Sequence, residues 1–138
     1  MKNLISFGLF ACTLLAANTS HAVALCDGAD VVCTSSATPA TACIFTDQKT
    51  AYVTVPDANN NGQAAGPFTN ITVPPVPNNL PGAGLSYSAE GFSLHVNTDF
   101  IQQAYTDFTG AKSKGYYSFL KAGTYNSAPR DFFCAVKK

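Results

Sequence analysis

The sequence predicts a small α+β domain that is mainly β: an antiparallel sheet of about five to seven strands with one helix packed on it, stapled by disulfides. Three observations predict this class. Residues 84–88 and 92–96 alternate apolar with polar side chains, as half-buried strands do. Apolar residues then recur at helical spacing from Phe100 to Phe108. Four cysteines follow the predicted export signal, an even number that suits two disulfides.

Residues 1–22 are predicted to be a signal peptide. Lys2 supplies the positive start, residues 4–17 form an apolar run of fourteen, and small residues follow. The run is too short to span a bilayer. Cleavage after Ala22 is favoured and cleavage after Ala24 is the alternative, since both sites have small residues at the two positions that a signal peptidase reads.

The leader predicts a secreted protein, either extracellular or, for a Gram-negative source, periplasmic. An alternative is a lipoprotein anchored at Cys12, because residues 9–12 resemble a bacterial lipobox. No second long apolar run follows the leader, so residues 23–138 are predicted to form one secreted domain without a membrane span.

Disulfides are predicted because four cysteines remain in an oxidising context. The pairing favoured from the sequence is Cys26 with Cys33 and Cys43 with Cys134, and the other two pairings stay open. The cysteine spacings match no zinc pattern, and His95 is the only histidine after the leader. The sequence therefore predicts no metal and no cofactor.

The first predicted strands are residues 42–46 and 50–55, the second ended by Pro56, which has no amide proton to give a sheet. Residues 56–83 are predicted to be a Pro/Asn-rich loop in which residues 68–73 are the only strand candidate. The triplet that begins at Asn70 is a glycosylation acceptor if a eukaryote secretes the protein.

Residues 84–96 predict a hairpin that turns at residues 89–91, where Gly91 suits a positive φ. A helix is predicted next, capped by Thr98 and ended by Gly110. Its apolar stripe is predicted to face the core: Phe100, Ile101, Ala104, Tyr105 and Phe108.

The last predicted strands are residues 116–120 and 132–136. A turn region that contains Pro129 separates them. The final strand is apolar on both sides and holds Cys134, which places it in the centre of the predicted sheet.

The charge balance argues against nucleic acid as a partner. The chain after Lys2 has seven basic and eight acidic residues, a net charge of −1. The charge is uneven, however: residues 23–107 carry −6 and residues 108–138 carry +5. The simplest interpretation is two oppositely charged halves of one fold, and the alternative is a basic face that meets a partner.

Catalysis has few candidate residues. A small secreted hydrolase would use His95 and Glu90, the only glutamate in the chain. No nucleophile elbow accompanies His95, and its position in the strand predicts a surface side chain. Phosphate loops and dinucleotide fingerprints are absent from the sequence.

One family resembles parts of the chain. Glu90-Gly91-Phe92, Tyr116-Tyr117 and Arg130 resemble, in the same order, fragments of the pattern of guanyl-specific secreted fungal ribonucleases. Ser118 stands where that family carries its catalytic glutamate, and there is no second histidine after the leader. The resemblance therefore implies a non-catalytic relative more than a ribonuclease.

The function predicted from the sequence is binding, as an effector, inhibitor or adhesive module, to another protein or a surface glycan. Aromatic and basic residues interleave near the C-terminus, a composition typical of interfaces. The candidate binding residues are Tyr116, Tyr117, Lys112, Lys114, Lys121 and Arg130.

Overall fold

Inward and outward side chains alternate along several strands of the computed structural model, which describes residues 26–75 and 84–137. These residues form eleven antiparallel strands and no helix, so the fold is all-β and the predicted α+β class is wrong. The strands are β1 Val31–Ser35, β2 Thr41–Phe45, β3 Thr50–Pro56, β4 Gly62–Ala64, β5 Phe68–Thr69, β6 Leu85–Ala89, β7 Phe92–Val96, β8 Gln103–Thr106, β9 Lys112–Ala122, β10 Tyr125–Asn126 and β11 Phe132–Val136.

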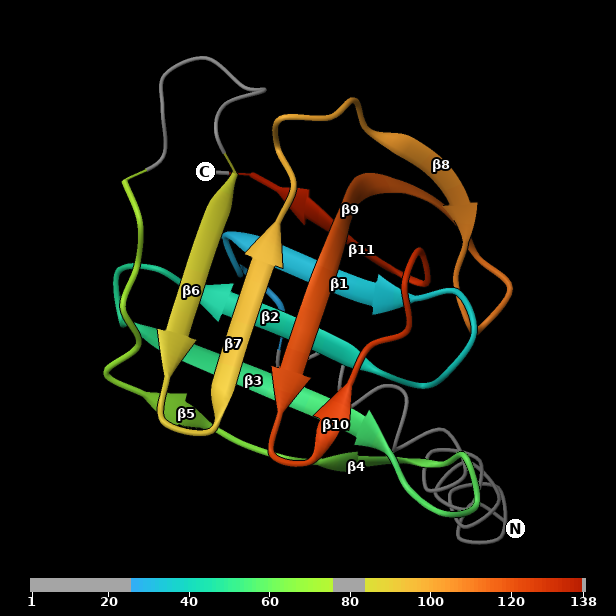
Figure 1. Ribbon diagram of the computed structural model, residues 1–138, viewed down its shortest axis with the longest axis horizontal. Helices are drawn as coiled ribbons and strands as arrows, with labels where there is room; N and C mark the ends of the chain where they lie inside the picture. The colour runs from blue at the N-terminus through green and yellow to red at the C-terminus, as the bar shows by residue number, and fades with distance from the viewer. Residues whose placement is uncertain (1–25, 76–83, 138) are drawn as a thin grey trace, which may run out of the picture.

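The strands form one sheet in the order β4-β3-β2-β1-β11-β9-β7-β6. The sheet curls into a half-barrel, so that β6, β7 and β9 lie across β1, β2 and β3 (Figure 1). β8 and β10 pair with β9, and β5 pairs with β3. A bridge between Thr72 and Ser88 links the segment after β5 to β6, so the two ends of the curled sheet meet there.

The core fills the inside of the curl. Ala51, Val53 and Val55 of β3 point inward, and so do Phe92, Leu94 and Val96 of β7, at every second residue. The side chains between them point outward. One-sided burial fixes the strand register, because a slip by one residue would expose the whole apolar set.

The predictions for the signal peptide, the Pro/Asn-rich loop and the later strands have different outcomes. The predicted signal peptide, including Cys12, and residues 76–83 of the Pro/Asn-rich loop lie outside the described residues. The described part of that loop holds β4 and β5, and Asn70 is exposed within it. The hairpin predicted at residues 84–96 is confirmed as β6 and β7, and β11 is central as predicted.

Two disulfides link the described cysteines, but not in the favoured pairing. Cys26 bonds to Cys43, and Cys33 bonds to Cys134. The reason lies in the strand register: Cys33 of β1 stands directly opposite Cys134 of β11, and both point into the core. Cys43 lies on β2, which does not touch β11, and its register partner Val32 lies on the outer face. The bonds indicate an oxidising, extracellular-type environment.

The predicted helix at residues 98–109 is replaced by two turns and β8. Phe100, Ile101 and Phe108, predicted to face the core, are exposed. Asp107 sets the turn after β8: its carboxylate accepts hydrogen bonds from the amides of Thr109 and Ala111, each at 2.9 Å. Gly110, with φ of +92°, completes a hairpin turn instead of ending a helix.

Tyr87 is the largest side chain fully enclosed in the core, and its hydroxyl finds no hydrogen-bond partner among the described residues. Tyr87→Phe is therefore expected to leave stability unchanged or raise it by about 1 kcal/mol, since a buried unpaired hydroxyl opposes folding. Burial, with a smaller effect from Asp30, raises the pKa of Tyr87 to about 12.

The raised pKa of Tyr87 makes stability fall at alkaline pH. The unfolded chain loses this proton near pH 10 while the folded protein holds it to about 12, so the stabilisation present below pH 10 is lost as the pH rises. The wild type should lose about 1 kcal/mol of its free energy of unfolding between pH 10 and 11 because of Tyr87, and Tyr87→Phe should not show this loss. Urea denaturation at pH 9, 10 and 11 measures it, with Tyr52→Phe on the outer face as control. The prediction would be contradicted if the free energy of unfolding changed with pH in the same way for Tyr87→Phe and the wild type.

Candidate functional site

The candidate site lies on the outer face of β6, β7 and β9, where strand alternation turns short polar side chains away from the core. Register aligns them in two rows across the strands. Ser86, His95 and Phe119 form the first row. The second row consists of Ser88, Ser93, Lys121 and Asn126, two residues further along the sheet.

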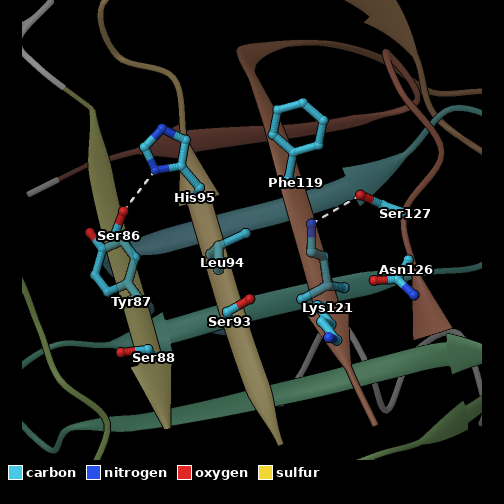
Figure 2. A pocket seen from close by; sticks show the side chains of 11 residues that line it. Ser86, Tyr87, Ser88, Ser93, Leu94, His95, Phe119, Lys121, Asn126 and Ser127 are labelled. Atoms are coloured by element: carbon cyan, nitrogen blue, oxygen red, sulfur yellow. Dashed lines mark hydrogen bonds between the residues drawn. The ribbon is translucent and has the colours of Figure 1, made fainter. Parts of the chain in front are cut away.

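The two rows border a shallow depression of about 310 Å³, which we call the serine depression. Figure 2 shows His95 and Phe119 side by side at one end, with Ser93 and Lys121 toward the other. The depression forms because the serine side chains are short while Phe119 and His95 are large. Its lining is Ser86, Tyr87, Ser88, Ser93, Leu94, His95, Phe119, Leu120, Lys121, Asn126 and Ser127.

Some hydrogen-bonding groups of the serine depression are engaged and others are free. Ser86 Oγ and His95 Nδ1 share a hydrogen bond of 2.7 Å, and the Leu120 amide donates to Ser127 Oγ at 2.9 Å (Figure 2). The side chains of Ser88, Ser93 and Asn126 make no hydrogen bond to any described residue. These groups are available to a ligand that can both donate and accept.

A ladder of four aromatic rings runs over the outer face to the serine depression. Phe119 contacts Tyr117 at 4.9 Å between ring centroids, Tyr117 contacts Phe133 at 6.5 Å, and Phe133 stacks on Tyr105 at 4.3 Å. We call Tyr105, Phe133, Tyr117 and Phe119 the aromatic ladder. Phe133 is covered by its neighbours, whereas Phe119 is 43% exposed at the open end.

Tyr105 fixes the far end of the aromatic ladder. Its hydroxyl shares a hydrogen bond with Thr34 Oγ1 of β1, across 71 residues of sequence. Burial is the main cause that raises the pKa of Tyr105 above its ordinary value, while the bond to Thr34 lowers it. This bond holds the β8–β9 hairpin to β1, and the stacking of Tyr105 on Phe133 holds it against the outer face of β11.

The structure does not bring the six predicted binding residues together. Tyr117 and Lys121 lie on the outer face of β9, the same face as the serine depression. Tyr116, in contrast, is buried in the core at 5% exposure, because it has the opposite phase on β9. Arg130 is exposed in the turn before β11, with φ of +67°.

Lys112 and Lys114 are exposed on the β8–β9 hairpin, away from the serine depression. They alternate with Ser113, whose register partner is Tyr105 of the aromatic ladder. The two lysines therefore project from the hairpin on the side opposite Tyr105. The predicted basic and aromatic segment is split between two faces.

The structure does not bring His95 and Glu90 together. Phe92, which begins β7, precedes His95 by three residues or about 10 Å along the strand, and Glu90 lies further away in the turn. The position that corresponds to the ribonuclease family's glutamate is also unsuitable: Ser118 is buried and donates to the carbonyl of Tyr116 at 2.8 Å. Residue 118 thus faces the core.

The most exposed ring of the site, Phe119, is not among the binding residues predicted from the sequence. Phe119 interleaves with the basic residues in the sequence, but the candidates chosen were its neighbours Tyr116 and Tyr117. Two-residue alternation from Tyr117 through Phe119 to Lys121 was the signal that could have found it. The serines of β6 and β7 carry no such signal, because any outward position accepts serine.

Comparison of the chain with protein-family models, with curated proteins and with solved structures finds no match. Among the described residues, no group of three or more His, Cys, Asp or Glu side chains is placed to hold a metal ion. The same residues contain no apolar helix of membrane-spanning length.

Proposed function

We propose that this protein is secreted and acts by binding, as an effector, inhibitor or adhesive module, rather than by catalysis. The observation that carries the proposal is the aromatic ladder, which crosses the outer face and ends in Phe119 beside the serine depression. An aromatic ring supplies a large contact area and has only two side-chain torsions to order, so it suits recognition. Phe119 faces away from the core, so burial in the fold does not account for its aromatic side chain.

The oxidising environment indicated by the two disulfides supports secretion, whether extracellular or periplasmic. The partner in such an environment is another protein or a surface glycan. Lipid anchoring at Cys12 is the alternative to release, and it concerns a residue outside the described part of the chain.

The hydrolase alternative receives less support. A general base needs an orienting or activating group within hydrogen-bond reach. Among the residues that the structure describes, His95 Nδ1 has only the hydroxyl of Ser86 there, and Glu90 lies at the far end of the hairpin. Within residues 26–75 and 84–137, the arrangement supplies neither a paired carboxylate nor an acid that would orient the imidazole.

Phe119→Ala is expected to weaken the complex with the partner at least tenfold, about 1.4 kcal/mol, the range of an interface hot spot. The matched control is Phe108→Ala, which removes a ring of similar exposure, 48% against 43%, from the turn after β8, outside the lining of the serine depression. The measurement is quantitative capture from the protein's native extracellular surroundings, with the wild type and both variants as immobilised baits.

The expected result is that one set of partners is lost with Phe119→Ala and retained with Phe108→Ala. Circular dichroism of all three proteins checks that the two substitutions leave the fold intact. Equal retention by the wild type and Phe119→Ala would show that the outer face is not the binding surface.

A further inference from the structure

We infer that the serine depression binds the ring of a neutral saccharide stacked on Phe119. This inference rests on the proposed function and specifies its ligand. It follows from three properties of the depression: an aromatic platform at one end, unpaired neutral hydrogen-bonding groups along the other, and a nearly uncharged lining.

Phe119 provides the platform. The face of an aromatic ring carries negative partial charge, and the C–H groups on the flat face of a pyranose carry positive partial charge, so the two surfaces attract. Tyr117 packs against Phe119 at 4.9 Å with an angle of 46° between the rings, which supports the ring from the side of the aromatic ladder. His95, its register partner on β7, stands beside it.

The spacing of the two rows matches one sugar ring. Adjacent strands lie about 4.8 Å apart, and positions two residues apart on one strand are separated by about 7 Å. A ring stacked on Phe119 therefore has its edge within reach of Ser93, which lies one strand across and two residues along. Ser88 stands opposite Ser93, and Asn126 stands opposite Lys121.

The free groups of the second row suit sugar hydroxyls. Ser88 and Ser93 offer hydroxyls, and Asn126 an amide, each of which both donates and accepts. Every sugar hydroxyl also donates and accepts, so the two sets can satisfy each other. At about 310 Å³ the depression is at the small end of ligand sites, which limits it to one or two rings.

Other ligand classes fit this lining less well. Lys121 is the only cation in the lining and there is no carboxylate, whereas a nucleic-acid strand is held by several cations along its phosphates. An extended peptide adds to a free sheet edge, but the depression lies on the face of three paired strands.

The test is NMR titration of the ¹⁵N-labelled, disulfide-bonded protein with defined sugars. The probes are methyl β-glucoside, methyl α-mannoside, N-acetylglucosamine and their linear oligomers. We expect at least one series to shift the amides of Ser93, His95 and Phe119 in a saturable manner. Phe119→Ala should lower the affinity at least tenfold and Phe119→Trp should retain it, because indole also stacks. Ser93→Ala should lower the affinity several-fold, and Phe108→Ala should leave it unchanged.

Three results would overturn the inference: no saturable shift at these amides with any sugar, saturable shifts with uridine monophosphate instead, or sugar binding that survives Phe119→Ala. The two proposals fail separately. If partner capture depends on Phe119 but no sugar shifts the amides, the proposed function stands and the saccharide inference fails. If neither capture nor sugar binding depends on Phe119, both fail.

Discussion

Replacing Cys33 and Cys134 together by alanine is expected to lower the free energy of unfolding by about 4 to 5 kcal/mol. The two residues are 101 positions apart, and closing a loop of about 100 residues stabilises a fold by about 4.7 kcal/mol in the chain-entropy model. Domains of this size have about 5 to 15 kcal/mol in total. The variant is therefore expected to unfold at low urea, which equilibrium denaturation measures.

The matched control is Cys26→Ala with Cys43→Ala, which removes the disulfide of shorter separation, 17 residues. The same model gives about 3 kcal/mol for such a loop. Alkylation of the wild type without reductant should modify none of the four cysteines, which checks the starting state. A larger loss for the Cys26–Cys43 variant would contradict the expected order.

Cysteine spacing in the sequence could predict that disulfides form but not which ones. A disulfide between neighbouring strands needs both side chains on one face, so the pairing depends on the phase of each strand. Val31, Cys33 and Ser35 point inward together, which puts Cys33 in phase with Cys134. The strands predicted from the sequence begin at residue 42, so the phase of β1 did not follow from them.

The β6–β7 hairpin was predictable because one face of each strand is buried and the turn between them is short. Leu85 and Tyr87 alternate against Phe92, Leu94 and Val96, and the hairpin appears as predicted. The helix was wrong because helical spacing at residues 100–108 is also produced by chance when turns hold apolar residues. A turn signal competes with it: Asp57 and Asp107 each accept hydrogen bonds from the amides two and four residues later.

The candidate site was harder to predict than the strands because it depends on register between distant segments. Ser93 and Lys121 lie 28 positions apart and become neighbours only when β7 pairs with β9. Local sequence fixes which side chains of one strand share a face, but not which residue of the next strand stands opposite. Lys121 and Tyr117 were therefore predicted as surface residues, while the serine depression was not.

At Gly115, β9 lies close against the backbone of β11. A Cβ atom at this residue would lie 2.8 Å from the carbonyl oxygen of Cys134, 3.0 Å from its carbonyl carbon and 3.2 Å from its nitrogen. All three atoms belong to the backbone of a central strand that also pairs with β1 and carries a disulfide. Such atoms cannot move aside as a flexible side chain would.

Gly115→Ala is therefore expected to destabilise the protein by about 2 to 3 kcal/mol, a typical cost of overpacking. The expected change in stability is opposite to the ordinary one, because alanine in a strand usually stabilises relative to glycine by about 0.5 to 1 kcal/mol. Urea denaturation distinguishes the two outcomes, with the exposed neighbour Lys114→Ala as control. Displacement of β9 should also move Tyr117 away from Phe133, so a change in tyrosine fluorescence is expected in the folded variant. A gain in stability would mean that the backbone of β11 leaves room for a side chain at this residue.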